Sequence, residues 1–337
     1  MVAGLAVAVI DSGIYYDHPF LKDNYVTGKD FINGDSDPDD IVGHGTHVAG
    51  TVGSTDEAIG IATDVDLIGL KVGEGRTIDS NAILQSLEWV LNNHEEYNIV
   101  AVNMSLGGGF YTSESEVDGD PRINLVRQLE EEGVVIVAAA GNSYQFKDRE
   151  KTVPNETANM GAPAIYSTIA VGAVWQNDTY PSDWDIEPQE PGTDRVTVFS
   201  QRLNAENFIL APGALIKSTS INGEFEEKPG TSMASPHVAG AIALLQEAAL
   251  EFGGRRLSSD EVADILRSTA DVVNDGDDEN DNVENTGENF PRLNIYNAVV
   301  EVKRRFEEIA PPPDDDTEEP MVAILMARSL VLLSDHY

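Results

Sequence analysis

Apolar and polar positions along this chain predict a regular alternation of strands and helices. Runs of nearly unbroken apolar residues are typical of strands that are buried on both faces. Such runs lie near residues 5–11, 66–72, 99–104, 134–140, 169–174 and 207–211. Helices are expected near residues 44–53, 80–93, 122–132 and 232–252, with further ones near 258–270 and 294–308. The alternation predicts an α/β fold, a three-layer sandwich with a mostly parallel central sheet and helices on both faces.

The predicted elements all lie in the first 308 residues, so we expect residues 1–308 to form a single domain. Residues 309–320 contain three consecutive prolines and a run of acidic residues, which predicts a stiff, charged linker. The tail, residues 321–337, includes an apolar stretch from Met321 to Leu333 that Arg328 interrupts. This stretch is too short to cross a bilayer, so no membrane span is predicted.

Composition narrows the range of partners. The chain carries 59 acidic and 21 basic residues, a net charge of -38, which argues against nucleic acid as a partner. It contains no cysteine, which excludes disulfides, thiol chemistry and cysteine-bound metals. We expect a monomer.

The most informative stretch is GTSMASPHVAG, residues 230–240. It places Ser232 where a glycine turn meets the start of an apolar helix, among small residues that would let a substrate backbone approach. A serine hydroxyl becomes a useful nucleophile only beside a base that a third group holds in place. Taken alone, Ser232 could also be a helix N-cap. Partners elsewhere in the chain must therefore decide between the two interpretations.

Two other stretches offer such partners. His44 begins the run HGTHVAGT, which follows a glycine, and Asp11 follows the apolar run LAVAVI at residues 5–10. An aspartate at the carboxyl end of a buried parallel strand lies at the edge where open α/β sheets bind ligands. A zinc site at His44 and His47 would lack a glutamate between them and a nearby third ligand. We therefore interpret His47 as structural.

The three stretches resemble the aspartate, histidine and serine motifs of the subtilisin-like serine proteases, the subtilases. The order Asp, His, Ser along the chain is also the subtilisin order. The resemblance covers about residues 3–305 and implies the subtilisin-like form of the three-layer sandwich. It implies Ser232 as the nucleophile, His44 as the general base and Asp11 as the carboxylate that orients His44.

Further motifs imply how the substrate is bound. The run VVIVAAAGN, residues 134–142, resembles the strand of the oxyanion hole, with the Asn142 side chain and the Ser232 N–H as donors. The run NMSLGGG, residues 103–109, resembles the strand that pairs with an extended polypeptide substrate. The implied substrate-binding residues are Ser105, Leu106, Gly107, Ala139, Ala140 and Gly141. Their small size predicts a pocket for a large apolar side chain before the scissile bond.

The resemblance implies a serine endopeptidase that hydrolyses peptide bonds through an acyl-enzyme intermediate. Two alternatives stay open. The same triad could join peptides or close macrocycles if an amine, rather than water, resolves the acyl-enzyme. A subtilase-like module could also bind peptides without catalysis.

No cofactor is expected for the chemistry, but a structural calcium ion is suggested by an acidic cluster before His44. Alternate carboxylates on a proline-constrained loop suit a hard cation; the candidate ligands are Asp35, Asp37, Asp39 and Asp40. The alternative is a solvated acidic turn. A second acidic run, residues 275–282, is similar to an oxygen-ligand loop but lacks the glycine and glutamate of an EF-hand.

The segment before Asp11 has no basic region of the kind that opens a signal peptide. It is also shorter than is usual in the family, and no pro-region precedes it. We expect the chain to be an N-terminally short piece of a longer product that carries a pro-region. That product is expected to be secreted or attached to the cell surface, with a cytoplasmic enzyme as the alternative.

Overall fold

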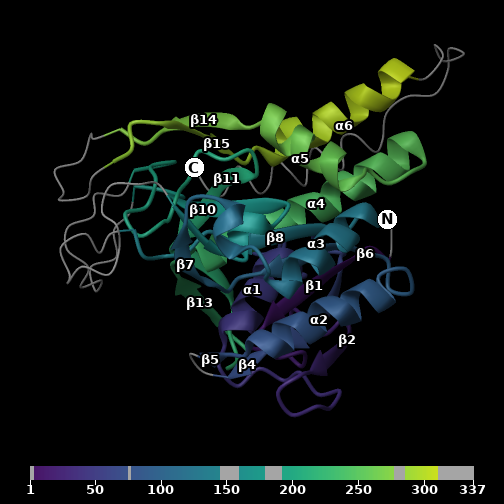
Figure 1. Cartoon of the computed structure of the whole chain (residues 1–337). Coiled ribbons are helices and arrows are strands. Elements are labelled where there is room, and N and C mark those ends of the chain that lie inside the picture. The colour runs from purple at the N-terminus through teal and green to yellow at the C-terminus, as the bar shows by residue number, and fades with distance from the viewer. Residues whose placement is uncertain (1–3, 75–76, 145–158, 179–191, 277–284, 310–337) are drawn as a thin grey trace, which may run out of the picture.

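The computed structural model describes residues 4–74, 77–144, 159–178, 192–276 and 285–309. Its centre is a nine-stranded sheet in the order β14-β15-β11-β10-β8-β6-β1-β3-β2 (Figure 1). The strands are β1 (Ala6–Asp11), β2 (Tyr25–Asp30), β3 (Asp66–Lys71), β6 (Ile99–Met104), β8 (Val135–Ala139), β10 (Ile169–Trp175), β11 (Phe208–Ala214), β14 (Asp271–Asn274) and β15 (Asn289–Arg292). Neighbours pair in parallel except β14 and β15, which are antiparallel.

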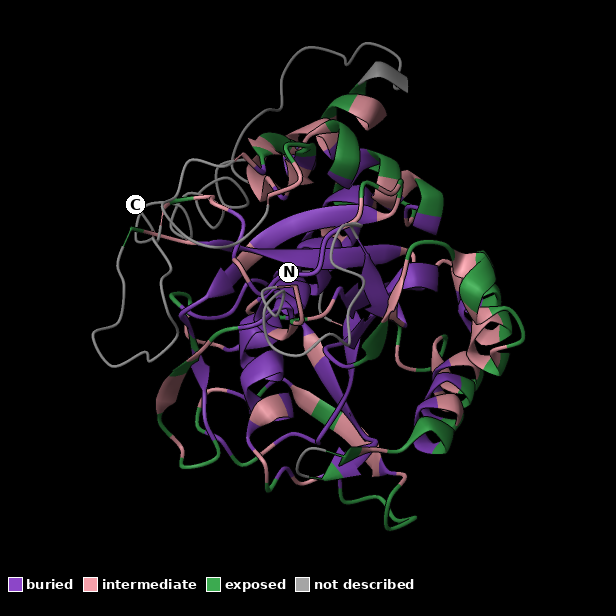
Figure 2. Cartoon of the chain, turned by 60° about the vertical axis from the view of Figure 1, so that its left-hand side comes forward, coloured by how far each residue is buried: buried purple, intermediate pink, exposed green. Residues whose placement is uncertain are grey.

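Helices cover both faces of this sheet. One face packs against α1 (His44–Gly53), α4 (Thr231–Gly253), α5 (Ser259–Ser268) and α6 (Ile295–Ile309). The other face packs against α2 (Ser80–Asn93) and α3 (Pro121–Glu131). Side chains alternate along β1, where Val7 and Val9 join the first core and Ala8 and Ile10 join the second. The predicted three-layer α/β sandwich is confirmed, and Figure 2 shows its buried sheet between helices with exposed outer surfaces.

Short elements surround the sheet. Three antiparallel pairs are formed by β4 (Gly73–Glu74) with β5 (Thr77–Ile78), β7 (Gly108–Tyr111) with β9 (Met160–Ala162), and β12 (Ile216–Thr219) with β13 (Phe225–Lys228). Among the described residues, 3₁₀ turns span Glu114–Val117 and Ala164–Tyr166. Because β5 and β7 follow the carboxyl ends of β3 and β6, they extend the edge of the sheet at which the candidate site lies.

Polar side chains fix where several helices begin. The Asp79 carboxylate accepts hydrogen bonds from two backbone N–H groups at the start of α2. Asp120 caps α3, whose first residue is Pro121. Proline has no backbone N–H, but at the first position of a helix an N–H would have no partner within the helix, so none is lost. A capping box between Ser258 and Glu261 begins α5. These caps satisfy backbone donors that the helices leave unpaired.

The apolar runs correctly predict β1, β3, β6, β8, β10 and β11, but they miss β2 and the pair β14 and β15. The predicted linker beyond residue 309 and the tail lie outside the described residues. None of the helices in the described part of the chain is long and apolar enough to cross a membrane.

Candidate active site

Asp11 and His44 meet at the carboxyl edge of the sheet. Asp11 is the last residue of β1, and His44 is the first residue of α1. The Asp11 side chain is only 3% exposed, and its Oδ1 accepts hydrogen bonds from His44 Nδ1 and from Ser12 N, both at 2.7 Å. A Cβ on Gly45 would overlap with the carbonyl oxygen of Gly13, so glycine permits this close approach of helix and strand.

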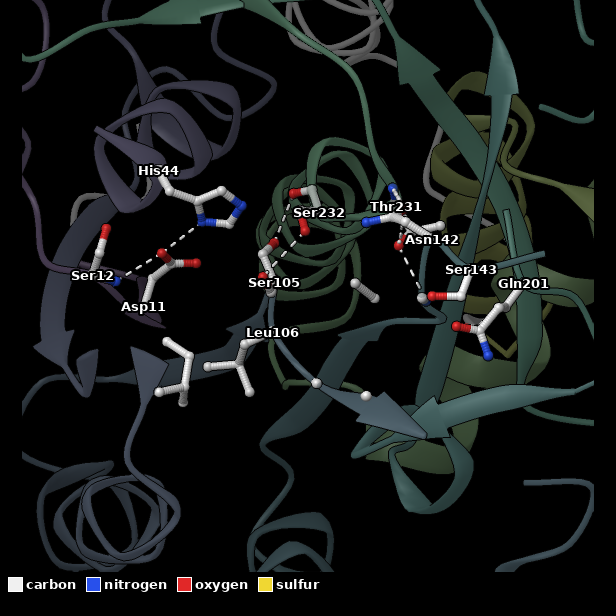
Figure 3. A pocket seen from close by; sticks show the side chains of 15 residues that line it. Asp11, Ser12, His44, Ser105, Leu106, Asn142, Ser143, Gln201, Thr231 and Ser232 are labelled. Carbon is white, nitrogen blue, oxygen red and sulfur yellow. Dashed lines mark hydrogen bonds and ion pairs between the residues drawn. The ribbon is translucent and has the colours of Figure 1, made fainter. Parts of the chain in front are cut away.

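Ser232 is the second residue of α4 and is linked to β6 through hydrogen bonds. Its Oγ donates to the carbonyl oxygen of Ser105 at 3.2 Å, while Ser105 Oγ donates to the carbonyl oxygen of Ser232 at 2.7 Å. No hydrogen bond joins Ser232 to His44, although both side chains are in the described part of the chain and line one cavity (Figure 3). The serine hydroxyl must therefore rotate toward His44 before His44 can take its proton.

Buried polar groups beneath Ser232 hold this turn in place. Asn103 Nδ2 donates to Ser105 Oγ at 2.9 Å, and Asn103 Oδ1 accepts from Ser235 Oγ at 2.6 Å. Asn103, Ser105 and Ser235 are all buried. These hydrogen bonds connect the end of β6 to the first turn of α4. The sequence motifs did not predict this role for Asn103 and Ser235.

Asn142 lies just beyond the end of β8, which neighbours β6 in the sheet. Its Oδ1 accepts hydrogen bonds from Thr231 N at 2.8 Å and Thr231 Oγ1 at 3.0 Å. This fixes the orientation of the side-chain amide and leaves Nδ2 pointing toward Ser232 in Figure 3. Nδ2 donates to no group in the described residues, so it is free to meet a developing negative charge.

The carboxyl ends of β1, β6 and β8 thus meet at one cavity. This cavity is lined by Ser105, Leu106, Gly107, Ala139 and Gly141, five of the residues predicted to bind substrate, together with Ile78 from β5. Ala140 is the exception among the predicted substrate-binding residues, because it is fully buried and packs into the core between the sheet and α2 and α3. Consecutive residues of an extended chain point to opposite faces, so Ala139 faces the cavity and Ala140 cannot.

Comparison with known proteins identifies the family. A family model for the subtilases matches residues 3–290. The chain belongs to the subtilase family. Subtilisin DY from Bacillus licheniformis is 36% identical over 81% of this chain and 86% of its own length. The major intracellular serine protease of Bacillus subtilis (strain 168) is 32% identical over 79% of this chain and 76% of its own length.

A crystal structure of a cold-adapted subtilisin-like serine proteinase agrees with this subtilase assignment, with a TM-score of 0.61 and 28% identity over 86% of this chain and 88% of that one. A structure described as the S41 psychrophilic protease matches with a TM-score of 0.65 and 29% identity, covering 86% of this chain and 91% of that one. The predicted enzyme class, a serine-type endopeptidase, is confirmed by relatives that are named serine proteases and subtilisins. The Bacillus subtilis relative and the intracellular serine protease of Paenibacillus polymyxa are both named as intracellular, so secretion of this subtilase stays a prediction beside the cytoplasmic alternative.

Asp40, in the acidic cluster before His44, has a structural role at the start of α1. Asp40 is buried, and its carboxylate accepts hydrogen bonds from Ser12 Oγ and from the backbone N–H groups of Val42, Gly43 and Thr46. Its Oδ2 also accepts from Thr46 Oγ1 at 2.7 Å. Asp40 therefore anchors the start of α1 in this subtilase, where His44 lies.

Two other aspartates of the cluster also accept hydrogen bonds within this loop or from Tyr16. Asp37 Oδ1 accepts hydrogen bonds from Tyr16 and from the backbone of Asp39, and Asp35 Oδ1 accepts from the backbone of Asp37. In the ranges that the structure describes, no three acidic or histidine side chains are grouped so that they could hold a metal ion. Calcium at Asp35, Asp37, Asp39 and Asp40 therefore gains no support from the grouping of the described side chains and stays a prediction. The second acidic run falls largely on residues 277–284, outside the described residues.

Proposed function

We propose that this subtilase hydrolyses peptide bonds with Asp11, His44 and Ser232 through an acyl-enzyme intermediate. The observation that carries the proposal is the 2.7 Å hydrogen bond between His44 Nδ1 and Asp11 Oδ1, at a cavity that Ser232 also lines. A proton on Nδ1 leaves the Nε2 lone pair free to act as a base. The charge of Asp11 then stabilises the imidazolium that forms when His44 takes a proton.

The reaction follows from these positions. His44 Nε2 takes the proton from Ser232 Oγ, and the oxygen attacks the carbonyl carbon of the scissile peptide. Asn142 Nδ2 and the Ser232 N–H donate to the oxyanion, the latter from the positive end of α4. His44 then gives its proton to the leaving amine. Water, activated by the same histidine, releases the acyl group and restores Ser232.

The substrate would lie as an extended polypeptide along Ser105, Leu106 and Gly107. These residues follow β6 at the open edge of the cavity, where their backbone can pair with an added strand. Ile78 in β5 lines the same cavity and would contact the peptide from the other side.

A fluorophosphonate probe tests the proposal directly, because it reacts only with an activated serine. We expect one covalent adduct per chain, which peptide mapping should locate on Ser232. With a peptide substrate, the masses of the two products should add up to the mass of the substrate plus one water. An unlabelled, folded protein would contradict the proposal and favour the peptide-binding module. Products joined to an added amine, in place of hydrolysed products, would favour the ligase.

The contribution of Asn142 can be measured by replacing it with leucine, which has a similar volume but no amide. We expect Asn142→Leu to lower kcat by roughly 100-fold to 1000-fold with little change in KM, because the lost donor acts on the oxyanion. Steady-state kinetics on a peptide anilide gives both constants.

Thr231→Val is the matched control for Asn142→Leu. It removes the hydroxyl that donates to Asn142 Oδ1 at 3.0 Å but retains the Thr231 N–H bond and the amide itself. We expect a much smaller loss of kcat. Equal losses in the two variants would mean that Asn142 only supports the turn.

The pH profile should report on His44. The negative charge of Asp11 raises the pKa of His44 above its ordinary value, against the effects of burial and of the Lys228 ammonium, which lower this pKa. Below its pKa the imidazole is protonated and cannot accept the serine proton. We therefore expect kcat/KM to rise with pH through one ionisation whose midpoint lies above about 6.5, the ordinary histidine value.

Lys228→Met tests the assignment of that ionisation. Lys228 Nζ donates to the carbonyl oxygen of Gly43 at 2.9 Å, next to His44, and its charge lowers the pKa of His44. Removing the charge should move the midpoint of the kcat/KM profile to higher pH. A midpoint that moves down or stays in place would assign the ionisation to another group.

A further inference from the structure

Gln201 is a polar side chain in the wall of the substrate cavity that the subtilase motifs do not include. It lies between β10 and β11, is only 2% exposed, and donates its backbone N–H to the carbonyl oxygen of Gly141 at 2.8 Å. A Cβ on Gly141 would overlap with Gln201 Oε1, so the amide packs directly on the backbone of this wall.

The orientation of the Gln201 amide is fixed by its nitrogen. Nε2 donates to the carbonyl oxygen of Gly109 at 3.1 Å and to Asn159 Oδ1 at 2.7 Å. A carbonyl oxygen can only accept, so the reversed amide would place two oxygens against each other. Oε1 must therefore point the other way, toward the cavity, as Figure 3 shows. Among the described residues, no group donates a hydrogen bond to Oε1.

Part of the wall near this oxygen has no side-chain donor. Leu106, Ala139 and the backbone of Gly107 and Gly141 border the same cavity, and Ser143, which also lines it, donates no hydrogen bond to Oε1. A bound substrate side chain that lacks a hydrogen-bond donor would displace water from Gln201 Oε1 and leave this oxygen without a partner, which opposes binding. Asp11 is the only carboxylate among the described lining residues, and it already pairs with His44, so these residues offer no counter-charge to a buried ammonium.

We infer that Gln201 is a specificity-determining residue, whose Oε1 selects a neutral hydrogen-bond donor at the end of the side chain before the scissile bond. Glutamine is the substrate residue that fits best, because it has the length to fill an apolar-walled pocket and ends in an amide. The inference rests on the proposed function and refines the expectation of a purely apolar preference.

Three peptide substrates that differ only at this position test the inference: tetrapeptide p-nitroanilides that end in glutamine, methionine or glutamate. These side chains have similar length but differ in donor and charge. For the wild-type chain we expect kcat/KM for glutamine to exceed that for methionine by roughly threefold to tenfold, the range of one buried hydrogen bond, and glutamate to be the poorest. In Gln201→Met the ratio of glutamine to methionine should fall below one.

Gln246→Met is the matched control. Gln246 is also fully buried and also uses its amide in two hydrogen bonds, both with Leu257, but it lies within α4 and not at the cavity. It measures what the loss of a buried amide does to the protein in general. We expect the ratio of glutamine to methionine to stay at the wild-type value in this variant.

The outcomes separate this inference from the proposed function. If the wild-type chain is labelled on Ser232 and cleaves these peptides, but Gln201→Met leaves the ratio unchanged, Gln201 does not determine specificity and the proposed function stands. If the wild-type chain is neither labelled nor active, both fail together. Should thermal melting show that Gln201→Met does not fold, a wild-type preference for methionine or glutamate over glutamine would by itself overturn the inference.

Discussion

Replacing Ser232 by alanine is expected to lower kcat by about six orders of magnitude, the loss found when the nucleophile of such a triad is removed. The loss is this large because Asp11, His44 and Ser232 act as a unit. Without the serine, only the oxyanion donors and substrate binding would still accelerate the reaction. The fold should be unaffected. Ser232 is half-buried, and its Oγ makes a single hydrogen bond, to the carbonyl oxygen of Ser105 at 3.2 Å. The carbonyl of residue 232 still accepts from Ser105 Oγ in the variant.

The measurement combines initial rates of peptide cleavage, fluorophosphonate labelling and thermal melting. Ser235→Ala is the control, because Ser235 lies one helical turn further along α4 and donates to Asn103 Oδ1 at 2.6 Å. Its loss leaves a buried acceptor unpaired and should lower the free energy of unfolding by about 1–3 kcal/mol, with a far smaller effect on rate. A Ser232→Ala protein that retains more than about one per cent of wild-type activity would be incompatible with a serine nucleophile at this position.

The positions of the proposed catalytic residues could be predicted because each stands at or next to the end of a regular element. Asp11 follows six apolar residues that are typical of a buried strand, and Ser232 lies at the start of a long apolar helix. In a parallel sheet the carboxyl ends of the strands lie at one edge, so residues far apart in the sequence meet there. Local pattern and topology therefore point to the same place for Asp11, Asn142 and Ser232.

The elements that were missed have a weaker local signal. The sequence of β2, Tyr25–Asp30, mixes a glycine, a lysine and an aspartate with apolar residues, because this strand lies at the edge of the sheet and is only partly buried. The pair β14 and β15 is short, with exposed residues such as Val272, and forms the opposite edge. Edge strands carry little of the apolar pattern on which the prediction depends.

The acidic cluster shows why the direction of a side chain cannot be inferred from spacing. Alternating aspartates have the same pattern whether their oxygens face a cation or a set of backbone N–H groups. The outcome here depends on Asp40, which turns inward to accept from Thr46 and Ser12. Gln201 was missed for a related reason, since its place on the cavity follows from contacts with Gly109 and Asn159, which are distant in sequence.

Replacing Asp11 by asparagine is expected to lower kcat by about four orders of magnitude while the protein stays folded. Asp11 Oδ1 alone accepts from both His44 Nδ1 and Ser12 N, and Oδ2 is buried and accepts no hydrogen bond from the described residues. If the asparagine oxygen occupies the place of Oδ1, the imidazolium loses the adjacent negative charge. If the amide is reversed, its nitrogen faces the imidazole and favours the wrong tautomer.

The pH profile distinguishes this electrostatic role of Asp11 from a purely structural one. Because the charge of Asp11 is the main factor that raises the pKa of His44, its removal must lower that pKa, and the acid limb of kcat/KM should move to lower pH. Asp30→Asn is the matched control: Asp30 is also buried, but its carboxylate accepts from Ile32 and Asn33 and pairs with Lys71. That variant should lose stability and keep the acid limb in place. If the acid limb also stays in place in Asp11→Asn, the carboxylate only supports the position of His44. Its charge would then not stabilise the imidazolium on which the proposed mechanism depends.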